Sequence, residues 1–231
     1  MHIPDGYLGP ATCGFFYVIM LPIWSIASKI VKKTLKVKQV PMLAIGAAFS
    51  FVIMMFNVPI PGGTTGHAVG AVLVAILLGP WAACIAITVA LVIQALLFGD
   101  GGITAIGANC FNMAFVMPFA GYYTYKVISY RAVLNSKRRI VAAGVAGYVA
   151  LNIAALLTGI EFGLQPLLHH TARGQSLYCP YGLNVAVPVM LGEHLLIFGW
   201  VEALVTALVI KYLLKHSPEL IKGGEVVNET H

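Results

Sequence analysis

Long apolar runs, separated by short polar or Gly/Pro-rich segments, dominate the chain. Roughly 20 apolar residues let a helix cross a bilayer, and runs near that length cover residues 15–31, 40–57, 106–127, 140–159 and 187–213. A further apolar stretch, 67–97, is long for one crossing and has Gly79-Pro80 at its middle. That pair makes either a kink or a tight turn between two short spans. The pattern predicts an all-α membrane protein.

The basic residues decide between the kink and the turn. One cluster of lysines follows the first predicted span, at 29–38, and a second basic cluster, at 126–139, lies between the spans 106–127 and 140–159. Loops rich in Lys and Arg stay in the cytoplasm. Both clusters fall on the same side only if 67–97 crosses twice. We therefore predict seven transmembrane helices, with the N-terminus outside and the C-terminus cytoplasmic.

The composition agrees with an integral membrane protein. Of the 231 residues, 59% are hydrophobic and only 10% are charged, too few to cover a soluble surface. The net charge of +6 does not indicate nucleic acid, because the basic residues stand in short clusters between apolar runs. We expect residues 1–231 to form one membrane domain.

The first residues, Met1-His2-Ile3-Pro4-Asp5-Gly6-Tyr7, hold the candidate chemistry. They place an α-amine, a backbone N–H and an imidazole within two residues, so three nitrogens can chelate one metal ion. Pro4 disfavours helix at Ile3 and Gly6 permits a turn, which predicts a bent segment. A fourth nitrogen would complete a planar site, which suits Ni(II) or Cu(II) better than Zn(II) or Mg(II). His67, after a Gly/Thr loop on the predicted outer side, is our candidate, and an interfacial histidine is the alternative.

Other polar residues are candidates for holding the ligands in place: Asp5, Thr64, Thr65, Gln94, Asn109, Asn112 and His194. Polar residues at membrane depth are usually functional, and groups around a metal fix the geometry of its ligands. In the alternative interpretation, the asparagines only form hydrogen bonds between helices. Glu193 and Glu202 are half a helical turn out of phase, so we expect their partners on other elements.

Small residues recur at four-residue spacing in Ala44-Ala48 and in Ala82-Ala86-Ala90. Such stripes let helices approach closely in lipid. They predict either internal packing or a docking surface for another membrane subunit.

The chain carries no HExxH, nucleophile elbow or Walker A sequence, so an ATP-driven step needs a partner. A membrane metalloenzyme, with Glu193 or Asp100 as base, is an alternative. A filled plane of four nitrogens leaves no position in that plane for a reacting water, which disfavours it. An autonomous secondary metal transporter is a further alternative, and it would be expected to show an internal repeat that we do not find.

These motifs together resemble the nickel/cobalt-binding membrane subunits (NikM and CbiM) of energy-coupling-factor transporters. The resemblance covers essentially the whole chain. It rests on Met1-His2-Ile3-Pro4-Asp5-Gly6, the loop 62–67, the segment 94–102, Gly107-Ala108-Asn109 and Glu202-Ala203.

The resemblance implies a non-catalytic, high-affinity binding subunit with Ni(II), or alternatively Co(II), as its substrate. It implies the fold of energy-coupling-factor substrate-binding subunits with an added N-terminal helix. The ligands map onto the Met1 amine, the backbone nitrogen and imidazole of His2, and the imidazole of His67. The implied partners are a transmembrane coupling subunit, two ATP-binding-cassette ATPases and a small accessory membrane subunit. The implied location is the cell (inner or plasma) membrane of a prokaryote.

Overall fold

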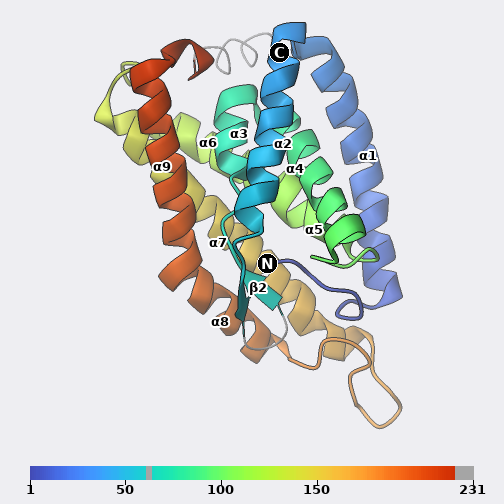
Figure 1. Ribbon diagram of the computed structural model, residues 1–231. Helices are drawn as coiled ribbons and strands as arrows, with labels where there is room; N and C mark the ends of the chain where they lie inside the picture. The colour runs from blue at the N-terminus through green and yellow to red at the C-terminus, as the bar shows by residue number, and fades with distance from the viewer. Residues whose placement is uncertain (61–63, 222–231) are drawn as a thin grey trace.

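Helices dominate the computed structural model, which describes residues 1–60 and 64–221 (Figure 1). The α-helices are α1 (Pro10–Thr34), α2 (Val40–Met54), α3 (Ala71–Leu78), α4 (Pro80–Ile93), α5 (Ile106–Asn109), α6 (Met117–Ile128), α7 (Lys137–Leu168), α8 (Leu183–Glu193) and α9 (Gly199–His216). A 3₁₀ turn, η1 (Val37–Gln39), precedes α2. The π-helical turn η2 (Gln94–Phe98) extends α4, η3 (Cys110–Val116) joins α5 to α6, and η4 (His194–Phe198) joins α8 to α9.

Five helical segments in the described chain are long and apolar enough to cross a membrane: Pro10–Thr34, Val37–Met54, Pro80–Phe98, Lys137–Leu168 and Leu183–His216. Their outward faces carry large exposed apolar side chains, among them Phe15, Ile45 and Trp200. An apolar exterior of this extent fits lipid and not water. The predicted multi-pass membrane protein is confirmed.

The stretch 67–97 turns at Gly79 and does not form one kinked helix. Gly79 has φ +85, a backbone conformation that other residues rarely adopt, and Pro80 begins α4 because it lacks the N–H needed to continue α3. The α3 helix has only eight residues, about 12 Å at 1.5 Å per residue. It is too short to cross a bilayer alone. The turn agrees with the predicted pair of short helices, whereas the five membrane-length segments of the described chain do not confirm seven crossings.

A small hairpin departs from the all-helical prediction. Strand β1 (Val58–Ile60) pairs antiparallel with β2 (Thr64–Gly66), with Val58 opposite Gly66. Prolines and glycines between α2 and α3 disfavour helix there. Residues 66–70 are all buried. Irregular backbone is tolerated at membrane depth where protein surrounds it, which explains why α3 begins only at Ala71.

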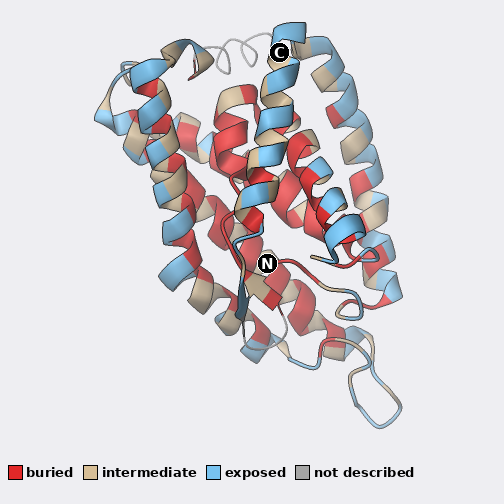
Figure 2. Cartoon of the chain, viewed as in Figure 1, coloured by how far each residue is buried: buried red, intermediate tan, exposed pale blue. Residues whose placement is uncertain are grey.

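The buried core lies around α3 and α7 (Figure 2). Small residues along α7, such as Ala142, Ala146 and Ala150, are fully buried and let neighbouring helices approach closely. The alanine stripe of α4, Ala82-Ala86-Ala90, is likewise buried and serves internal packing, whereas Ala44 and Ala48 of α2 are exposed. All four cysteines are buried and free.

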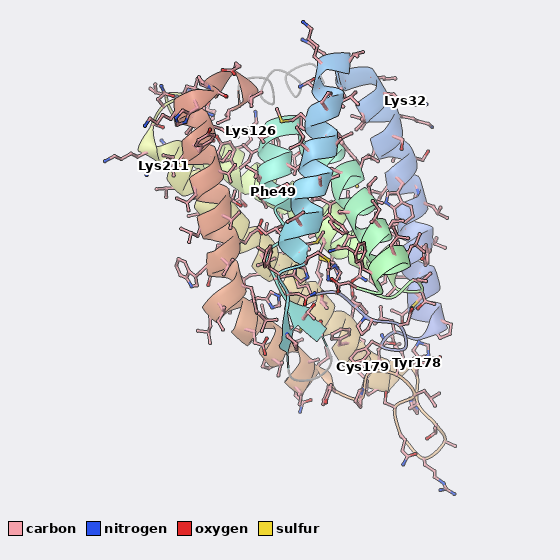
Figure 3. The ribbon with its side chains drawn as sticks, in the orientation of Figure 1. Lys32, Phe49, Lys126, Tyr178, Cys179 and Lys211 are labelled. Carbon is pink, nitrogen blue, oxygen red and sulfur yellow. The ribbon has the colours of Figure 1, made fainter. Side chains whose placement is uncertain are left out.

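Basic side chains from three different helices gather at one end of the bundle. Figure 3 shows Lys32 of α1, Lys126 of α6 and Lys211 of α9 at this end, and Tyr178 and Cys179 toward the opposite end. The N-terminal segment reaches that opposite end, where Cys179 N donates to the Tyr7 carbonyl at 3.1 Å. The two predicted basic clusters therefore share one end of the protein.

Candidate metal centre

The N-terminal segment folds back into the protein, and its first three residues are buried (Figure 2). Asn109, the last residue of α5, clamps the main chain of Ile3. Its Oδ1 accepts from Ile3 N at 2.9 Å and its Nδ2 donates to Ile3 O at 3.1 Å. Gly102 N also donates to Ile3 O, at 2.8 Å. The α-amine is thereby fixed two residues from a rigid anchor.

Further contacts hold the rest of the segment. The Asp5 carboxylate is exposed and accepts from Ile103 N at 3.1 Å and from Thr104 N at 2.9 Å. The hydrogen bond from the Thr104 hydroxyl is the main cause of a lowered pKa at Asp5. Gly9 N donates to Gln165 Oε1 on α7 at 2.9 Å. Asp5 therefore anchors the segment to the loop between η2 and α5 and does not face the candidate ligands.

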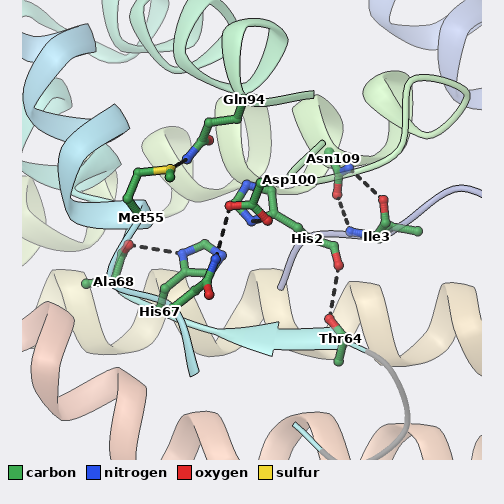
Figure 4. A network of polar contacts seen from close by, with 10 residues as sticks. His2, Ile3, Met55, Thr64, His67, Ala68, Gln94, Asp100 and Asn109 are labelled. Atoms are coloured by element: carbon green, nitrogen blue, oxygen red, sulfur yellow. Dashed lines mark hydrogen bonds and ion pairs between the residues drawn. The ribbon is translucent and has the colours of Figure 1, made fainter. Parts of the chain in front are cut away.

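His2 and His67 come together although they lie 65 positions apart in the sequence. Their rings are stacked, with centroids 4.5 Å apart and an interplanar angle of 26°. In Figure 4, His2, His67 and Asp100 gather at the centre of the view, and Ile3 with Asn109 lies beside them. The candidate ligands from the N-terminus and from the loop before α3 therefore share one site.

The orientation of the His67 ring leaves one nitrogen available. Its Nδ1 lies 3.1 Å from the carbonyl oxygen of Ala68 and donates to it, since a carbonyl only accepts. Its Nε2 is buried without a hydrogen-bond partner among the described residues. A hydrogen bond at one ring nitrogen sets the tautomer and keeps the lone pair of the other free for a metal.

Burial keeps the candidate ligands uncharged. It lowers the pKa of the Met1 amine from 8.0 to about 4, although the nearby Asp100 and Glu193 carboxylates act in the opposite direction. Burial, with the charge of the amine, lowers the pKa of His2 from 6.5 to about 3. The pKa of His67 is lowered well below its usual value for the same reasons. All three groups are neutral near pH 7, which is the state that binds a metal.

Asp100, which the sequence suggested only as the base of the metalloenzyme alternative, is a contact of the site. Its Oδ1 lies 3.2 Å from His2 Nδ1 without forming a hydrogen bond, and its Oδ2 accepts from Asn57 Nδ2 at 3.1 Å. Burial raises the pKa of Asp100, whereas the Met1 amine and Asn57 favour the carboxylate. The Gly-rich segment Gly99-Asp100-Gly101-Gly102 was the available signal.

The other predicted residues divide into those near the ligands and those that bond elsewhere. Thr64 Oγ1 donates to the carbonyl of His2 at 3.0 Å. Gln94 is fully buried and lies near His2, and its Nε2 is 3.8 Å from Met55 Sδ. The hydroxyl of Thr65 is buried with no hydrogen-bond partner in the part of the chain that is described.

The described hydrogen bonds of Asn112 and His194 go to helical residues and not to the candidate ligands. Asn112 Nδ2 bonds to Thr158 Oγ1 at 3.2 Å and to Glu161 Oε2 at 2.9 Å, both on α7, so it joins helices. The His194 ring is fully buried, and its Nδ1 donates to Met190 O at 2.8 Å. Gln94, Asn112 and His194 each lie in a π-helical turn, a feature frequent at functional sites.

Side chains alone do not form the site. In the described residues, no group of three or more His, Cys, Asp and Glu side chains is placed to hold a metal ion. A four-nitrogen site at His2 and His67, as predicted from the sequence, would therefore also need the Met1 amine and the His2 backbone nitrogen. Such a set of nitrogens favours square-planar ions.

Comparison with known proteins shows the family. Residues 2–220 match the family described as the cobalt uptake substrate-specific transmembrane region, CbiM. The chain belongs to the CbiM family. Among CbiM relatives, a probable fused nickel transport protein LarMN of Lactiplantibacillus plantarum is 54% identical over 94% of this chain and 66% of its own length. A putative metal transport protein of Methanocaldococcus jannaschii is 50% identical over 97% and 96% of the two chains.

A solved structure, described as a truncated transition metal transporter, superposes with a TM-score of 0.90 at 57% identity, over 94% of this chain and 99% of that one. Two relatives are fused proteins, and this chain spans only 66% and 64% of their lengths. These proteins are named as transporters. The family comparison therefore indicates a transporter component and not an enzyme, which sets aside the metalloenzyme alternative.

Proposed function

We propose that this chain is the substrate-binding subunit of an energy-coupling-factor-type uptake system that carries Ni(II), with Co(II) as the alternative ion. One observation carries the proposal. A buried amino terminus lies beside two neutral imidazoles, and His67 Nε2 has no partner among the described residues. Burying two imidazole rings with unpaired nitrogens beside an α-amine is costly unless a ligand compensates them, and a metal ion provides that compensation.

The four donors are the Met1 amine, the backbone nitrogen and Nδ1 of His2, and Nε2 of His67. The amine and backbone nitrogens close a five-membered chelate ring, and the backbone nitrogen and Nδ1 close a six-membered ring. The backbone nitrogen binds only after it loses its proton, so a bound Ni(II) ion retains one net positive charge. The carboxylate of Asp100, 3.2 Å from His2 Nδ1, offsets that charge inside the protein.

The remainder of the transport system lies outside the chain. No Walker A sequence is present, so a transmembrane coupling subunit and two ATP-binding-cassette ATPases supply the driving force. Two fused relatives are about half as long again as this chain, and the additional length supplies an accessory membrane part. The basic end of the bundle faces the cytoplasm of a prokaryotic cell and the metal centre faces outward. The extended segment before α3 completes a seventh crossing.

The test is an extension of the chain by one residue ahead of Met1. The extension converts the Met1 amine into an amide and moves the new amine out of the chelate ring, whereas His2 and His67 are unchanged. Because Met1 is only 1% exposed, the pocket has no room for the added residue. Isothermal titration of Ni(II) should show binding lost about as completely as in His2→Ala or His67→Ala.

The matched control is His170→Ala, which removes an exposed outer-loop imidazole and should leave Ni(II) binding unchanged. Undiminished affinity in the extended protein would eliminate the N-terminal chelate and leave an ordinary histidine site.

A further inference from the structure

The candidate ligands are anchored to different parts of the fold. Met1 and His2 are held through Ile3 by Asn109 at the end of α5. The loop that carries His67 is held by Glu202 of α9, 132 to 133 positions away along the chain. The fourth ligand thus depends on a different helix from the first three.

Glu202 binds the loop with both carboxylate oxygens. Its Oε2 accepts from Val69 N at 2.7 Å and from Gly70 N at 3.0 Å, and its Oε1 lies 3.2 Å from Gly70 N. The side chain is fully buried. Gly70, at φ +74, turns its N–H toward the same acceptor as that of Val69. A buried carboxylate is costly unless its hydrogen bonds are made, so this contact strongly constrains the loop.

A single peptide unit connects Glu202 to His67. The N–H of Val69 and the carbonyl of Ala68 belong to the same planar amide, and the carbonyl accepts the hydrogen bond from His67 Nδ1 at 3.1 Å. The amide is rigid, so fixing its N–H also fixes its carbonyl. The Glu202 carboxylate thus contacts the Ala68–Val69 amide, and that amide in turn contacts the His67 imidazole. Groups that bond to the second nitrogen of a metal-binding histidine orient its ring and raise its basicity.

We propose that Glu202 is a positioning residue that aims His67 Nε2 at the metal ion through the Ala68–Val69 peptide, an inference that rests on the proposed function. Loss of the Glu202 contact should therefore let the His67 ring turn away, while the Met1-His2 segment stays held by Asn109. Removal of one donor from a planar four-nitrogen site weakens it.

The competing explanation is that Glu202 only caps α3. A carboxylate at the first turn of a helix stabilises it whatever ion is bound. The two explanations differ in whether the effect of Glu202 on metal binding passes through the His67 imidazole. A double-mutant cycle between Glu202 and His67 separates them, because a residue that acts through His67 has no further effect once the imidazole is absent.

The full chain is compared as wild type, Glu202→Gln, His67→Ala and the double variant. Cu(II) is the probe for the cycle, because it binds nitrogen sites more tightly than Ni(II) and makes the residual Met1-His2 chelate measurable. Glu202→Gln should weaken metal binding about 10- to 100-fold in the native background, the usual effect of losing such a supporting group. In the His67→Ala background it should change the affinity less than about twofold. Chelator-induced loss of Ni(II) should be faster in Glu202→Gln than in wild type.

Glu161→Gln is the matched control. It also removes a buried carboxylate, whose described hydrogen bond goes to Asn112 and not to the loop of His67, and it should bind metal like the wild type. If Glu202→Gln fails to fold, Glu202→Asp keeps the carboxylate at shorter reach and should give an intermediate affinity.

Equal losses in both His67 backgrounds, or wild-type affinity in Glu202→Gln, would overturn the positioning role. Neither result bears on the N-terminal chelate, which the one-residue extension tests separately.

Discussion

Nickel binding at pH 7 should release about one proton per ion from the intact protein, and about two from a peptide of its first seven residues. In the free peptide the α-amine, with a pKa near 8, is about nine-tenths protonated at pH 7, and the imidazole, with a pKa near 6.5, about one quarter. In the protein the pKa of the Met1 amine is about 4 and that of His2 about 3, so neither group carries a proton at pH 7. The protein and the peptide each also lose the backbone N–H proton of His2, which adds one released proton in both cases.

The sign of the pH dependence follows from the same pKa values. Because the folded-state pKa of the Met1 amine lies below its value in a free chain, an undocked N-terminus binds protons that the docked one cannot. Docking of the segment is therefore fully favourable above about pH 8 and is lost as the pH falls toward 4. Nickel affinity should fall about tenfold per pH unit near pH 7, and more steeply in acid, where undocking adds protons to be displaced.

Isothermal titration at pH 7 in buffers of different ionisation enthalpy measures the proton number, and the synthetic peptide is the matched control. Release of two protons from the intact protein would mean that the amine is charged before nickel binds, against the burial of Met1. Release of none would mean that the backbone nitrogen of His2 is not a ligand.

Two further predictions concern the anchor and the topology. Asn109→Ala removes both hydrogen bonds to Ile3 and should weaken Ni(II) binding about 10- to 100-fold by titration; unchanged affinity would show that the segment docks without this clamp. A single cysteine at the exposed position Gln175 should be labelled by a membrane-impermeant reagent from outside, and one at the exposed position Asn135 only from inside. The native cysteines are buried and should not react. Labelling of both from one face would contradict the proposed orientation.

Local chemistry made much of the helical architecture predictable. Apolar runs of membrane length depend on composition within a short window, so their positions follow from the sequence. The turn at Gly79-Pro80 also follows from two neighbouring residues, because proline cannot continue a helix and glycine tolerates φ > 0. The short length of α3 was not predictable in this way. It depends on the burial of residues 66–70 by other helices, which allows extended backbone at that depth.

The candidate site likewise has a part that the sequence predicts and a part that only the packing reveals. Met1, His2 and His67 could be chosen because an α-amine, a backbone nitrogen and imidazoles are the donors a planar nitrogen site needs, whatever the fold. Asn109 and Asn112, three residues apart on one helical run, could not be told apart. Only the packing shows that Asn109 holds Ile3 while Asn112 bonds to α7.

The contacts of Glu202 and of Asp100 could not be predicted from the sequence either. The spacing of Glu193 and Glu202 indicates that they do not form a pair, but it cannot name the amides of Val69 and Gly70 as partners of Glu202. Asp100 beside His2 is a similar case, since it requires the loop after η2 to meet the N-terminus. The sequence determines which groups can bind a metal, because that is a property of residue type. Tertiary structure decides which of them meet and which stay neutral, because distance and burial arise only when segments far apart in the chain pack together.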